Sequence, residues 1–374
     1  MSKIGIDLLW LKPRKVAGIA SMAKSLLEGF LKYGSDKHVF YLFVTKDNKY
    51  EFEFLEQVSK FKFIECPILS HKIIKRHIWK AMHFDYIAKK HGLDLVFVPN
   101  YEKAYFSNSK IPYVSVIHDL QPLHYPQYHS FLRRIWIRLN VKKSLQTSSR
   151  VVAISNFVKK DVIDNFEIDE ENISVIHNPV YIKNEFVNWK DVKKKYNIEQ
   201  RYYYTVSTLW PHKNLKTLLY LLQKIKNSDY NVPRNLIISG VTSKRAVNET
   251  KDLANNLGIF ENILLTDFVS NAERNILYKK SDIFLFPSIF EGFGMPPIEA
   301  MYFGKPVITT KCGAIPEVTQ GKAIYVNDPY SIDEWFDKIL YVYSLKLNAP
   351  ERLNVYSLKD ITIKYMSLIE NALI

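Results

Sequence analysis

Few cysteines and no long apolar run occur in this sequence of 374 residues. The two cysteines, Cys66 and Cys312, lie far apart and offer neither a disulfide framework nor the spacing of a metal site. No stretch reaches the ~18 apolar residues that a membrane-spanning helix requires. The N-terminal residues also lack the apolar core of a signal peptide. We therefore expect a protein of the reducing cytoplasm, either soluble or bound peripherally to a membrane.

The chain is strongly basic, which favours anionic ligands but does not distinguish among their classes. Lys and Arg number 52 against 38 Asp and Glu, a net charge of +14. Residues 1–180 hold 27 Lys and Arg and 18 Asp and Glu, so +9 of the excess lies in the N-terminal half. Such an excess favours nucleic acid, an anionic membrane or phosphate-bearing ligands.

Short apolar, β-branched runs alternate with amphipathic segments along the whole chain, without internal repeats or low-complexity tracts. In the first half the predicted strands are Lys3–Leu9, Val39–Val44, Leu93–Val98, Tyr113–Ile117, Val151–Ile154 and Ile173–Ile176, and the predicted helices are Ile19–Tyr33 and Arg133–Thr147. The pattern restarts after the polar, lysine-rich segment Tyr181–Gln200, which we interpret as a connection between domains. The later predicted strands are Tyr202–Val206, Asn235–Ile238, Ile263–Thr266, Ile283–Phe286 and Pro306–Thr309, and the later helices are Leu215–Ser228, Asn271–Lys279, Pro297–Phe303 and Leu358–Ile374.

This βα alternation predicts parallel sheets with helices on both faces, and the length favours two domains. We predict an α/β protein with two Rossmann-like βα domains that face each other across a cleft. Their expected limits are residues 1–183 and 184–355, and a helix in residues 356–374 is expected to pack back toward the N-terminal domain. Ligands of such sheets bind beyond the carboxyl ends of the strands, so the cleft is the expected substrate site.

The segment Glu291-Gly-Phe-Gly-Met-Pro-Pro-Ile-Glu299 follows a predicted strand and leads into a predicted helix. Its two glycines allow close approach of the backbone to a ligand, and its two prolines fit the first positions of a helix. The free N–H groups of that helix would attract anions or sugar hydroxyls. Glu291 precedes the helix, Glu299 is expected in its first turn, and both carboxylates could accept from sugar hydroxyls. Acidic residues are also common at helix starts because the dipole favours them, which is an alternative explanation for Glu299.

A second strand-to-helix loop is Val206-Ser-Thr-Leu-Trp-Pro-His-Lys-Asn-Leu215. Lys213 would lie near a helix N-terminus, where its ammonium group could neutralise a diphosphate. A solvated loop lysine is the alternative. The chain contains no Asp-x-Asp triplet, the usual carboxylate pair for a metal-bound diphosphate. Lys213 and helix ends are therefore expected to carry that charge without a metal.

Two loops of the N-terminal half complete the pattern. His118 follows the predicted strand Tyr113–Ile117, where its ring could hydrogen-bond a sugar hydroxyl or assist proton transfer. A core or capping histidine is the alternative. Gly18, in the segment Lys15-Val-Ala-Gly18-Ile-Ala20 after the first strand, could let backbone amides reach a phosphate, although this is not a complete G-x-G-x-x-G motif.

Together these segments resemble the family four retaining glycosyltransferases, which have the GT-B fold. Glu291 and Glu299 match the E-x7-E pattern of that family, and Ser207–Leu215 matches its Gly-Thr-Leu-x-Pro-Arg-Lys-Asn-Leu loop. His118-Asp-Leu matches a turn of its bacterial mannosyl- and rhamnosyltransferase branch, and Gly18 matches the glycine of its first loop. Two departures stand out, because Ser207 replaces a glycine and His212 replaces an arginine. The second departure implies a weaker or neutral phosphate contact.

The resemblance implies roles for these residues. Lys213 and the Gly18 loop would bind the diphosphate, Glu299 the ribose hydroxyls, and Glu291 the donor sugar, which His118 would contact from the acceptor side. The base would lie near Gly240, Phe268 and Val269. The implied catalytic residues are His118, Glu291 and Lys213, and the implied donor-binding residues are Gly18, Ser207, Thr208, Lys213, Asn214, Gly240, Phe268, Val269, Glu291, Phe293, Gly294, Met295 and Glu299.

The implied function is retaining, metal-independent transfer of a hexose in bacterial surface polysaccharide biosynthesis, such as that of O-antigen or capsule, with no cofactor. Mannose from GDP-mannose is the first expectation for the donor, rhamnose from dTDP-rhamnose the second, and UDP-hexoses stay open. The expected acceptor is a lipid-linked oligosaccharide. Two basic, aromatic stretches, His71–Lys80 and Phe131–Arg138, resemble interfacial helices and suggest docking on the inner, anionic face of the membrane. A solvated helix face is the alternative.

Three other functions fit parts of the sequence. A nucleotide-sugar epimerase of the same fold would release a free sugar without an acceptor. A nucleic-acid-binding protein would fit the charge of +14, but no helix-turn-helix, zinc finger or RNP motif supports it, so no nucleic-acid partner is expected. A non-catalytic lectin or scaffold is disfavoured because Glu291, Glu299, Lys213 and His118 are all intact.

Overall fold

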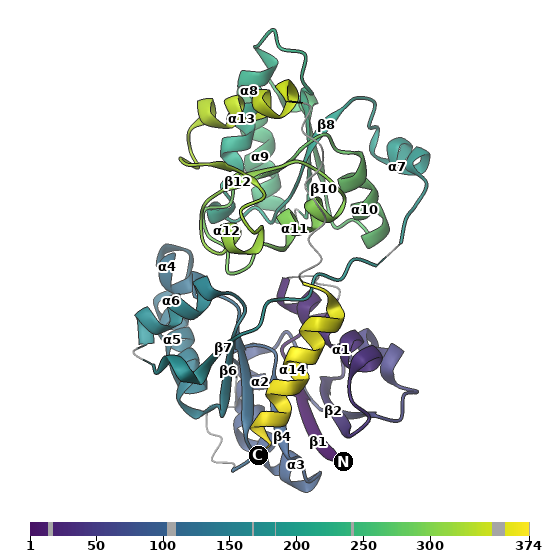
Figure 1. The fold of residues 1–374 in the computed structure, drawn as a ribbon, viewed down its shortest axis with the longest axis vertical. Helices are drawn as coiled ribbons and strands as arrows, with labels where there is room; N and C mark the ends of the chain where they lie inside the picture. Colours follow the sequence, from purple (N-terminus) through teal and green to yellow (C-terminus); the bar gives the residue numbers. More distant parts are fainter. Residues whose placement is uncertain are drawn as a thin grey trace. The chain divides into compact units, whose positions relative to one another are not determined.

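The computed structural model describes residues 1–13, 18–102, 110–166, 168–183, 185–240, 243–345 and 356–373. The chain forms two compact units (Figure 1). Unit 1 comprises Met1–Tyr181 together with Tyr356–Ile374, and unit 2 comprises Ile182–Val355. Each unit is described by itself below.

Unit 1 is built on a seven-stranded, all-parallel sheet in the order β3-β2-β1-β4-β5-β6-β7. Its strands are β1 (Ser2–Asp7), β2 (His38–Thr45), β3 (Phe61–Cys66), β4 (Leu95–Val98), β5 (Tyr113–Ile117), β6 (Arg150–Ala153) and β7 (Ile173–Val175). Its helices are α1 (Gly18–Tyr33), α2 (Ile73–Trp79), α3 (Asp85–Lys90), α4 (Gln121–His124), α5 (Phe131–Thr147), α6 (Asn156–Phe166) and α14 (Leu358–Ala372), with short η1 (Lys49–Leu55), η2 (Lys80–Phe84), η3 (Pro126–Tyr128) and η4 (Glu170–Asn172).

Helix α14 brings the end of the chain back onto unit 1, beside α1 (Figure 1). Its buried face includes Ile361, Tyr365 and Ile369, and Tyr365 packs edge-on against Phe97 of β4. The last turn of the helix also pairs Glu370 with the ring of His38 at 3.0 Å. The C-terminal segment is therefore part of the core of the unit that the N-terminus begins.

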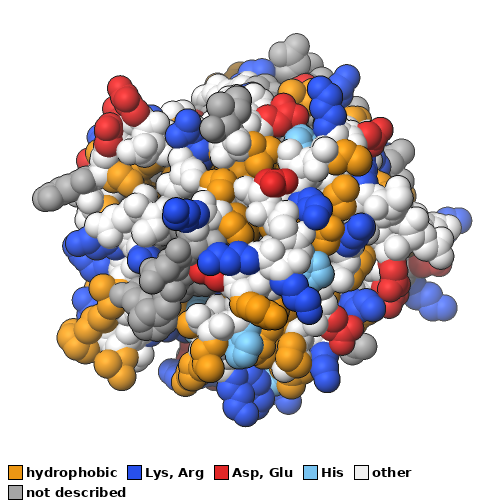
Figure 2. Space-filling model, turned by 90° about the horizontal axis from the view of Figure 1, so that it is seen from below, with side chains coloured by type: hydrophobic (Ala, Val, Ile, Leu, Met, Phe, Trp, Pro, Cys, Tyr) orange, Lys and Arg blue, Asp and Glu red, His pale blue; other side chains and the backbone are white. Residues whose placement is uncertain are grey.

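On the surface of unit 1, large apolar side chains are exposed among lysine and arginine side chains. Helix α2 and its continuation expose Ile74, Ile78 and Met82, and α5 exposes Phe131 and Leu132. Figure 2, a view from the lower end of Figure 1, shows hydrophobic side chains interspersed with Lys, Arg and His.

Unit 2 has a six-stranded parallel sheet in the order β10-β9-β8-β11-β12-β13. Its strands are β8 (Tyr202–Val206), β9 (Asn235–Ser239), β10 (Ile263–Thr266), β11 (Phe284–Phe286), β12 (Val307–Thr310) and β13 (Ile324–Val326). Its helices are α7 (Trp189–Tyr196), α8 (Leu215–Lys226), α9 (Lys244–Asn256), α10 (Asn271–Lys280), α11 (Met295–Tyr302), α12 (Ile315–Val318) and α13 (Ile332–Ser344), with short η5 (Pro211–Lys213) and η6 (Phe260–Asn262).

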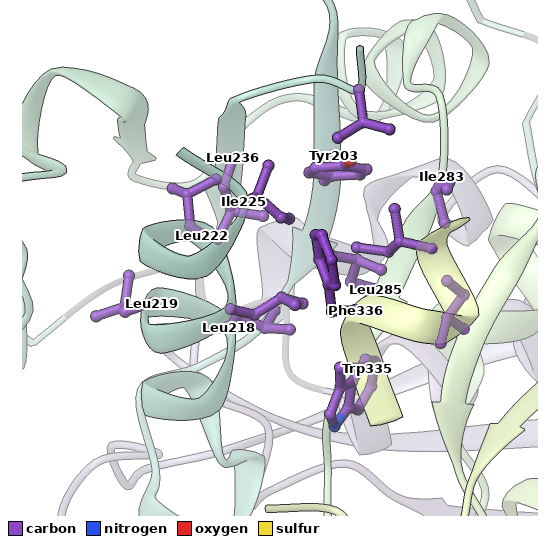
Figure 3. Packing of buried hydrophobic residues seen from close by; sticks show 14 of the residues in the cluster. Tyr203, Leu218, Leu219, Leu222, Ile225, Leu236, Ile283, Leu285, Trp335 and Phe336 are labelled. Atoms are coloured by element: carbon purple, nitrogen blue, oxygen red, sulfur yellow. The ribbon is translucent and has the colours of Figure 1, made fainter. Parts of the chain in front are cut away.

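The core of unit 2 lies between one sheet face and helices α8 and α13. Leu218, Leu222 and Ile225 of α8 meet Leu285 of the sheet and Trp335 of α13 (Figure 3). Trp335 is fully buried, and its indole N–H donates to the carbonyl of Pro329 at 3.1 Å, so burial leaves no unpaired donor. This packing fixes the strands whose carboxyl ends carry the site described next.

The predicted connection Tyr181–Gln200 begins at the boundary between the two units and contains helix α7, which the sequence analysis did not predict. Asn188 caps its start by accepting from the N–H of Lys190 at 2.9 Å, and Asn197 ends it with a left-handed φ of 51°. Only Val192 is buried on this helix, so the polar sequence of α7 lacks the apolar spacing that predicts a helix. Capping by asparagine at both ends, and not an apolar stripe, defines the element.

Candidate functional site

The loops that carry Lys213 and Glu291 meet where the strand order of unit 2 reverses. From β8 the chain proceeds to β9 and β10 on one side, and β11 to β13 lie on the other. Strands β8 and β11 are direct neighbours, paired through Tyr204 and Phe284. The gap outside the carboxyl ends of two such strands is where open α/β sheets bind ligands.

Lys213 and Glu291 form an ion pair at this position. The Nζ atom of Lys213 lies 2.5 Å from Oε1 of Glu291, and both side chains are largely buried, with 20% and 12% exposed. Two residues separated by 78 positions in the sequence are thus brought into direct contact. At the strand ends, the partly buried ammonium group of Lys213 can bind a phosphate, and the carboxylate of Glu291 can accept a hydrogen bond from a hydroxyl.

Backbone hydrogen bonds tie the two loops together. The carbonyl of His212 accepts from the N–H of Ile289 at 2.9 Å and from the hydroxyl of Ser288 at 3.3 Å. Asn214 has a left-handed φ of 50° directly after η5, and its side-chain amide donates to the carbonyl of Pro329 at 3.0 Å. These contacts hold Lys213 on a rigid turn.

A third loop, after β12, contacts the backbone of Glu291. The N–H of Ala314 donates to the carbonyl of Glu291 at 2.9 Å. Gly313 has a φ of +60°, and a Cβ atom there would overlap the carbonyl oxygen of Glu291. Sequence reasoning did not single out Gly313, since a glycine after a strand gives no sign that the backbone of another loop lies against it.

Glu299 is buried and already held by two side chains of α10. The hydroxyl of Tyr278 donates to its Oε2 at 2.9 Å, and the guanidinium of Arg274 lies 3.6 Å from its Oε1. Burial, followed by the charge of Glu299, raises the pKa of Tyr278 well above its usual range, so this tyrosine stays a donor. The prediction that Glu299 lies in the first helical turn is wrong, because α11 begins at Met295 and places Glu299 at the start of the second turn.

The start of α11 offers backbone donors beside the ion pair. Gly294 precedes the helix with a φ of +91°, which a residue with a side chain adopts only at a cost. Met295 begins the helix, and Phe293, two residues earlier, is buried. The first N–H groups of a helix have no partners within it, so they can donate to an anion or a hydroxyl.

The loops after β8, β9 and β10 meet at the same edge. Gly240 has a φ of +94°, and a Cβ atom there would lie 3.3 Å from the carbonyl oxygen of Ser207. The hydroxyl of Ser207 donates to the carbonyl of Thr208 at 2.8 Å. Phe268 is half exposed, and Val269 beside it is partly buried. The structure thus places these predicted residues along one continuous edge of the sheet.

His212 is a neutral neighbour of Lys213. Burial first, and the Lys213 ammonium second, lower the pKa of His212 to about 4, although Glu291 opposes this. The sequence-based expectation was that a histidine in place of an arginine gives a weaker or neutral contact here. An imidazole with this pKa carries no charge at neutral pH, so Lys213 provides the positive charge of the loop.

His118 and Gly18 belong to unit 1. His118 follows β5, is buried, and donates its Nε2–H to the carbonyl of Pro99 at 2.8 Å. Burial lowers its pKa to about 4, so the ring is neutral and keeps Nδ1 as an acceptor. Gly18 begins α1, and no described atom would lie within 4 Å of a Cβ there. Its predicted companion Lys15 lies outside the described residues.

The described residues contain neither a candidate membrane-spanning helix nor a candidate metal cluster. No helix within them is both long and apolar enough to cross a membrane. Among the same residues, no group of three or more His, Cys, Asp or Glu side chains is arranged to hold a metal ion.

Known proteins resemble the chain in both halves. The family model described as Glycosyltransferase Family 4 matches residues 16–183, and the model described as Glycosyl transferases group 1 matches residues 188–360. The O-antigen chain mannosyltransferase RfbU of Salmonella typhimurium is 32% identical over 64% of this chain and 63% of its own length. The O-antigen chain mannosyltransferase B of Escherichia coli is 27% identical over 69% of this chain and 66% of its own. Each match spans less than two thirds of the relative.

Solved structures share the fold over nearly the whole chain. HepE of Anabaena, solved with UDP and glucose, has a TM-score of 0.73 at 17% identity and covers 99% of this chain and 100% of its own. A glycosyltransferase of Rickettsia africae has a TM-score of 0.65 at 22% identity, with 100% and 94% covered. The two family models together extend over both βα units. The chain therefore belongs to the family four glycosyltransferases, has their GT-B fold, and is similar to the O-antigen mannosyltransferases among them.

Proposed function

We propose that this protein transfers a hexose, with mannose favoured over rhamnose, from a nucleotide-sugar to a glycan acceptor in the biosynthesis of a bacterial surface polysaccharide. The observation that carries the proposal is the ion pair of Lys213 and Glu291 at the strand-order reversal of unit 2. Mannose is favoured because several relatives are mannosyltransferases by name. GDP-mannose is thus the first candidate donor, and dTDP-rhamnose is the second.

In the proposed complex the diphosphate replaces Glu291 as the partner of Lys213. The ammonium group and the first N–H groups of α11 neutralise the charge that develops on the leaving diphosphate, so the reaction needs no metal. Glu291, once released, accepts hydrogen bonds from hydroxyls of the donor sugar. Tyr278 and Arg274 fix the position of Glu299, so its carboxylate can accept hydrogen bonds from the ribose hydroxyls without moving.

We propose that transfer retains the configuration at the anomeric carbon. The acceptor hydroxyl oxygen attacks this carbon from the face that the diphosphate leaves, the bond between carbon and diphosphate oxygen breaks, and the departing diphosphate takes the hydroxyl proton. The protein contributes position and charge. His118, neutral and fixed by Pro99, contributes an acceptor nitrogen for a sugar hydroxyl. The proposed acceptor is a lipid-linked oligosaccharide at the inner membrane face.

Thermal shifts with GDP-mannose, dTDP-rhamnose and UDP-glucose test the donor class directly. A ligand at a hundred times its Kd stabilises the folded state by about 2.7 kcal/mol, so one nucleotide-sugar should raise the melting temperature clearly above the others. We expect GDP-mannose to give the largest shift. If none of the three changes the melting temperature at millimolar concentration, the proposed function is wrong.

A further inference from the structure

A stripe of exposed apolar side chains follows the continuous helical segment α2–η2–α3 of unit 1. Ile74, Ile78, Met82 and Tyr86 are spaced four residues apart and are 75%, 55%, 69% and 67% exposed. Residues four apart lie on one face of a helix. Single exposed apolar residues are ordinary, but a stripe of four on one face marks a surface that contacts something apolar.

Helix α5 adds a second exposed apolar row with cations between its members. Phe131, Leu132 and Ile135 are 68%, 77% and 42% exposed. The helix carries five cations and no acidic residue, and no Asp or Glu occurs anywhere from Leu120 to Lys160. Its apolar and basic side chains are therefore interleaved along a segment that contains no acidic residue.

The two helices are in contact with each other. The ring of His77 on α2 packs edge-on against Trp136 of α5, with ring centroids 4.7 Å apart. The two cations of α2–η2 that turn inward, Arg76 and Lys80, are buried and paired with Glu102 and Asp7, respectively. The inward charges are thus neutralised inside unit 1, while Lys72 and Lys75 stand exposed beside the apolar stripe.

We propose that this face of α2–η2–α3 and α5 binds the surface of an anionic lipid bilayer. Its apolar side chains enter the boundary between head groups and acyl chains, and its cations contact the head groups. A second copy of this chain is a poorer occupant, since a symmetric contact would bring the same cations face to face. The inference rests on the proposed function in one respect, because a lipid-linked acceptor would then be presented at the bound membrane.

Co-sedimentation with vesicles tests the proposal on the full chain without any nucleotide. Vesicles of phosphatidylcholine alone are compared with vesicles containing one third phosphatidylglycerol, at low and at high salt. We expect binding to the anionic vesicles that weakens as salt rises. Binding that is absent at low salt, or equal for the two compositions, would overturn the proposal.

Two triple variants separate the contributions of charge and apolar surface. R133Q/R134Q/R138Q should weaken binding to anionic vesicles by roughly a hundredfold, since each basic residue near such a surface contributes about 1 kcal/mol. I74S/I78S/M82S should weaken it at least tenfold and also at high salt. The matched control Y220S/Y341S removes exposed aromatics from α8 and α13 of unit 2 and should bind like the unchanged chain.

Far-UV circular dichroism and a thermal unfolding curve without ligand confirm that each variant is folded. If the apolar variant changes only the oligomeric state in sedimentation and not vesicle binding, the surface is a contact between copies and the proposal fails. The two proposals fail separately. Vesicle binding without any nucleotide shift supports the surface and refutes the transferase, and the reverse result refutes only the surface.

Discussion

Gly313 shows how strongly one backbone position can control the candidate site. A side chain there would overlap the carbonyl oxygen of Glu291 and would require a φ of +60°. We expect Gly313→Ala to move the Glu291 loop, to abolish nucleotide-sugar binding and to cost at least 1–2 kcal/mol of unfolding free energy, roughly the cost of the left-handed conformation alone. Calorimetric titration of the donor and urea unfolding measure the two effects.

Gly321 provides the matched control. Its φ is +69°, but no described atom lies within 4 Å of a Cβ built there. Gly321→Ala should therefore pay only the conformational cost and keep full donor affinity. Equal loss of affinity in both variants would show that backbone strain in general, and not the contact with Glu291, determines donor binding.

The pair of Lys213 and Glu291 should behave as a coupled unit. Lys213→Ala leaves a largely buried carboxylate without its cation, and Glu291→Ala does the converse. Each single change should destabilise the protein by roughly 1–3 kcal/mol, while the double variant should lose clearly less than the sum. Additive losses in a urea double-mutant cycle would contradict the coupling.

The order of donor affinity among these variants should differ from the order of their stability. Lys213→Ala and the double variant both lack the diphosphate cation, so both should bind the nucleotide-sugar far more weakly than the unchanged chain, and all three variants should lose transfer. Glu291→Ala should keep more donor affinity than Lys213→Ala, because its proposed contacts are to the sugar alone. Full transfer activity in any of the three would remove the proposed role of the residue concerned.

Among the elements, α14 depends on a close approach to α1. Gly29 faces Thr362 so closely that a Cβ atom would overlap its hydroxyl. Gly29→Ala should destabilise unit 1 by about 1–3 kcal/mol, the usual cost of overpacking, and Thr362→Ala in the same chain should restore part of that loss. Gly18→Ala, in the same helix, meets no described atom and should cost nothing in urea unfolding. Equal destabilisation by the two alanines would mean that the packing against α14 is not the cause.

The elements also show which signals a sequence carries. The α/β fold class is confirmed, and buried strands such as β5 and β8 were predicted at their observed bounds because nearly all of their residues are aromatic or β-branched. Strand β3 was missed because Lys62 and Glu65 interrupt its pattern, as suits an edge strand. Strand β13, which is short and lies at an edge of its sheet, was also missed. Edge elements have one neighbour, so their composition is less constrained.

The contacts of the candidate site also fall into those that the sequence indicates and those that it does not. The meeting of Lys213 with Glu291 follows from two loops at the ends of parallel strands, which a sequence pattern can indicate. The contacts of Gly313 with Glu291, and of Tyr278 and Arg274 with Glu299, could not be predicted, because they depend on how α10 and the β12 loop pack against other segments. The distances between segments that lie far apart in the chain cannot be read from a single sequence.

At the scale of the whole molecule, the buried His118 and His212 and the partly buried His77 predict sensitivity to mild acid. Burial is the largest cause in each case and lowers the pKa of His118 and His212 to about 4 and that of His77 to about 3. The neighbouring cations Arg76 and Lys80 act on His77 in the same direction, as Lys213 does on His212. All three rings are neutral in the folded chain at neutral pH.

Their contribution to stability has a definite sign. An unfolded histidine takes up a proton near pH 6.5, whereas these folded ones resist until about pH 4 or below. Between these values the unfolded state binds more protons, so the free energy of unfolding is highest above pH 6.5 and falls as the pH is lowered. Each histidine contributes a slope of at most about 1.4 kcal/mol per pH unit in this window. The lowered pKa values of Asp47, Glu273 and Glu334 act only at lower pH, below the usual carboxyl range.

Urea unfolding from pH 7 to pH 4.5 measures this slope, and His118→Asn isolates one part of it. The variant loses ring packing and is less stable at pH 7, but it has one group fewer to protonate on unfolding, so its stability should fall less steeply with acid. A slope that His118→Asn does not change would mean that the ring of His118 titrates equally in both states, and that its burial beside Pro99 does not keep it neutral.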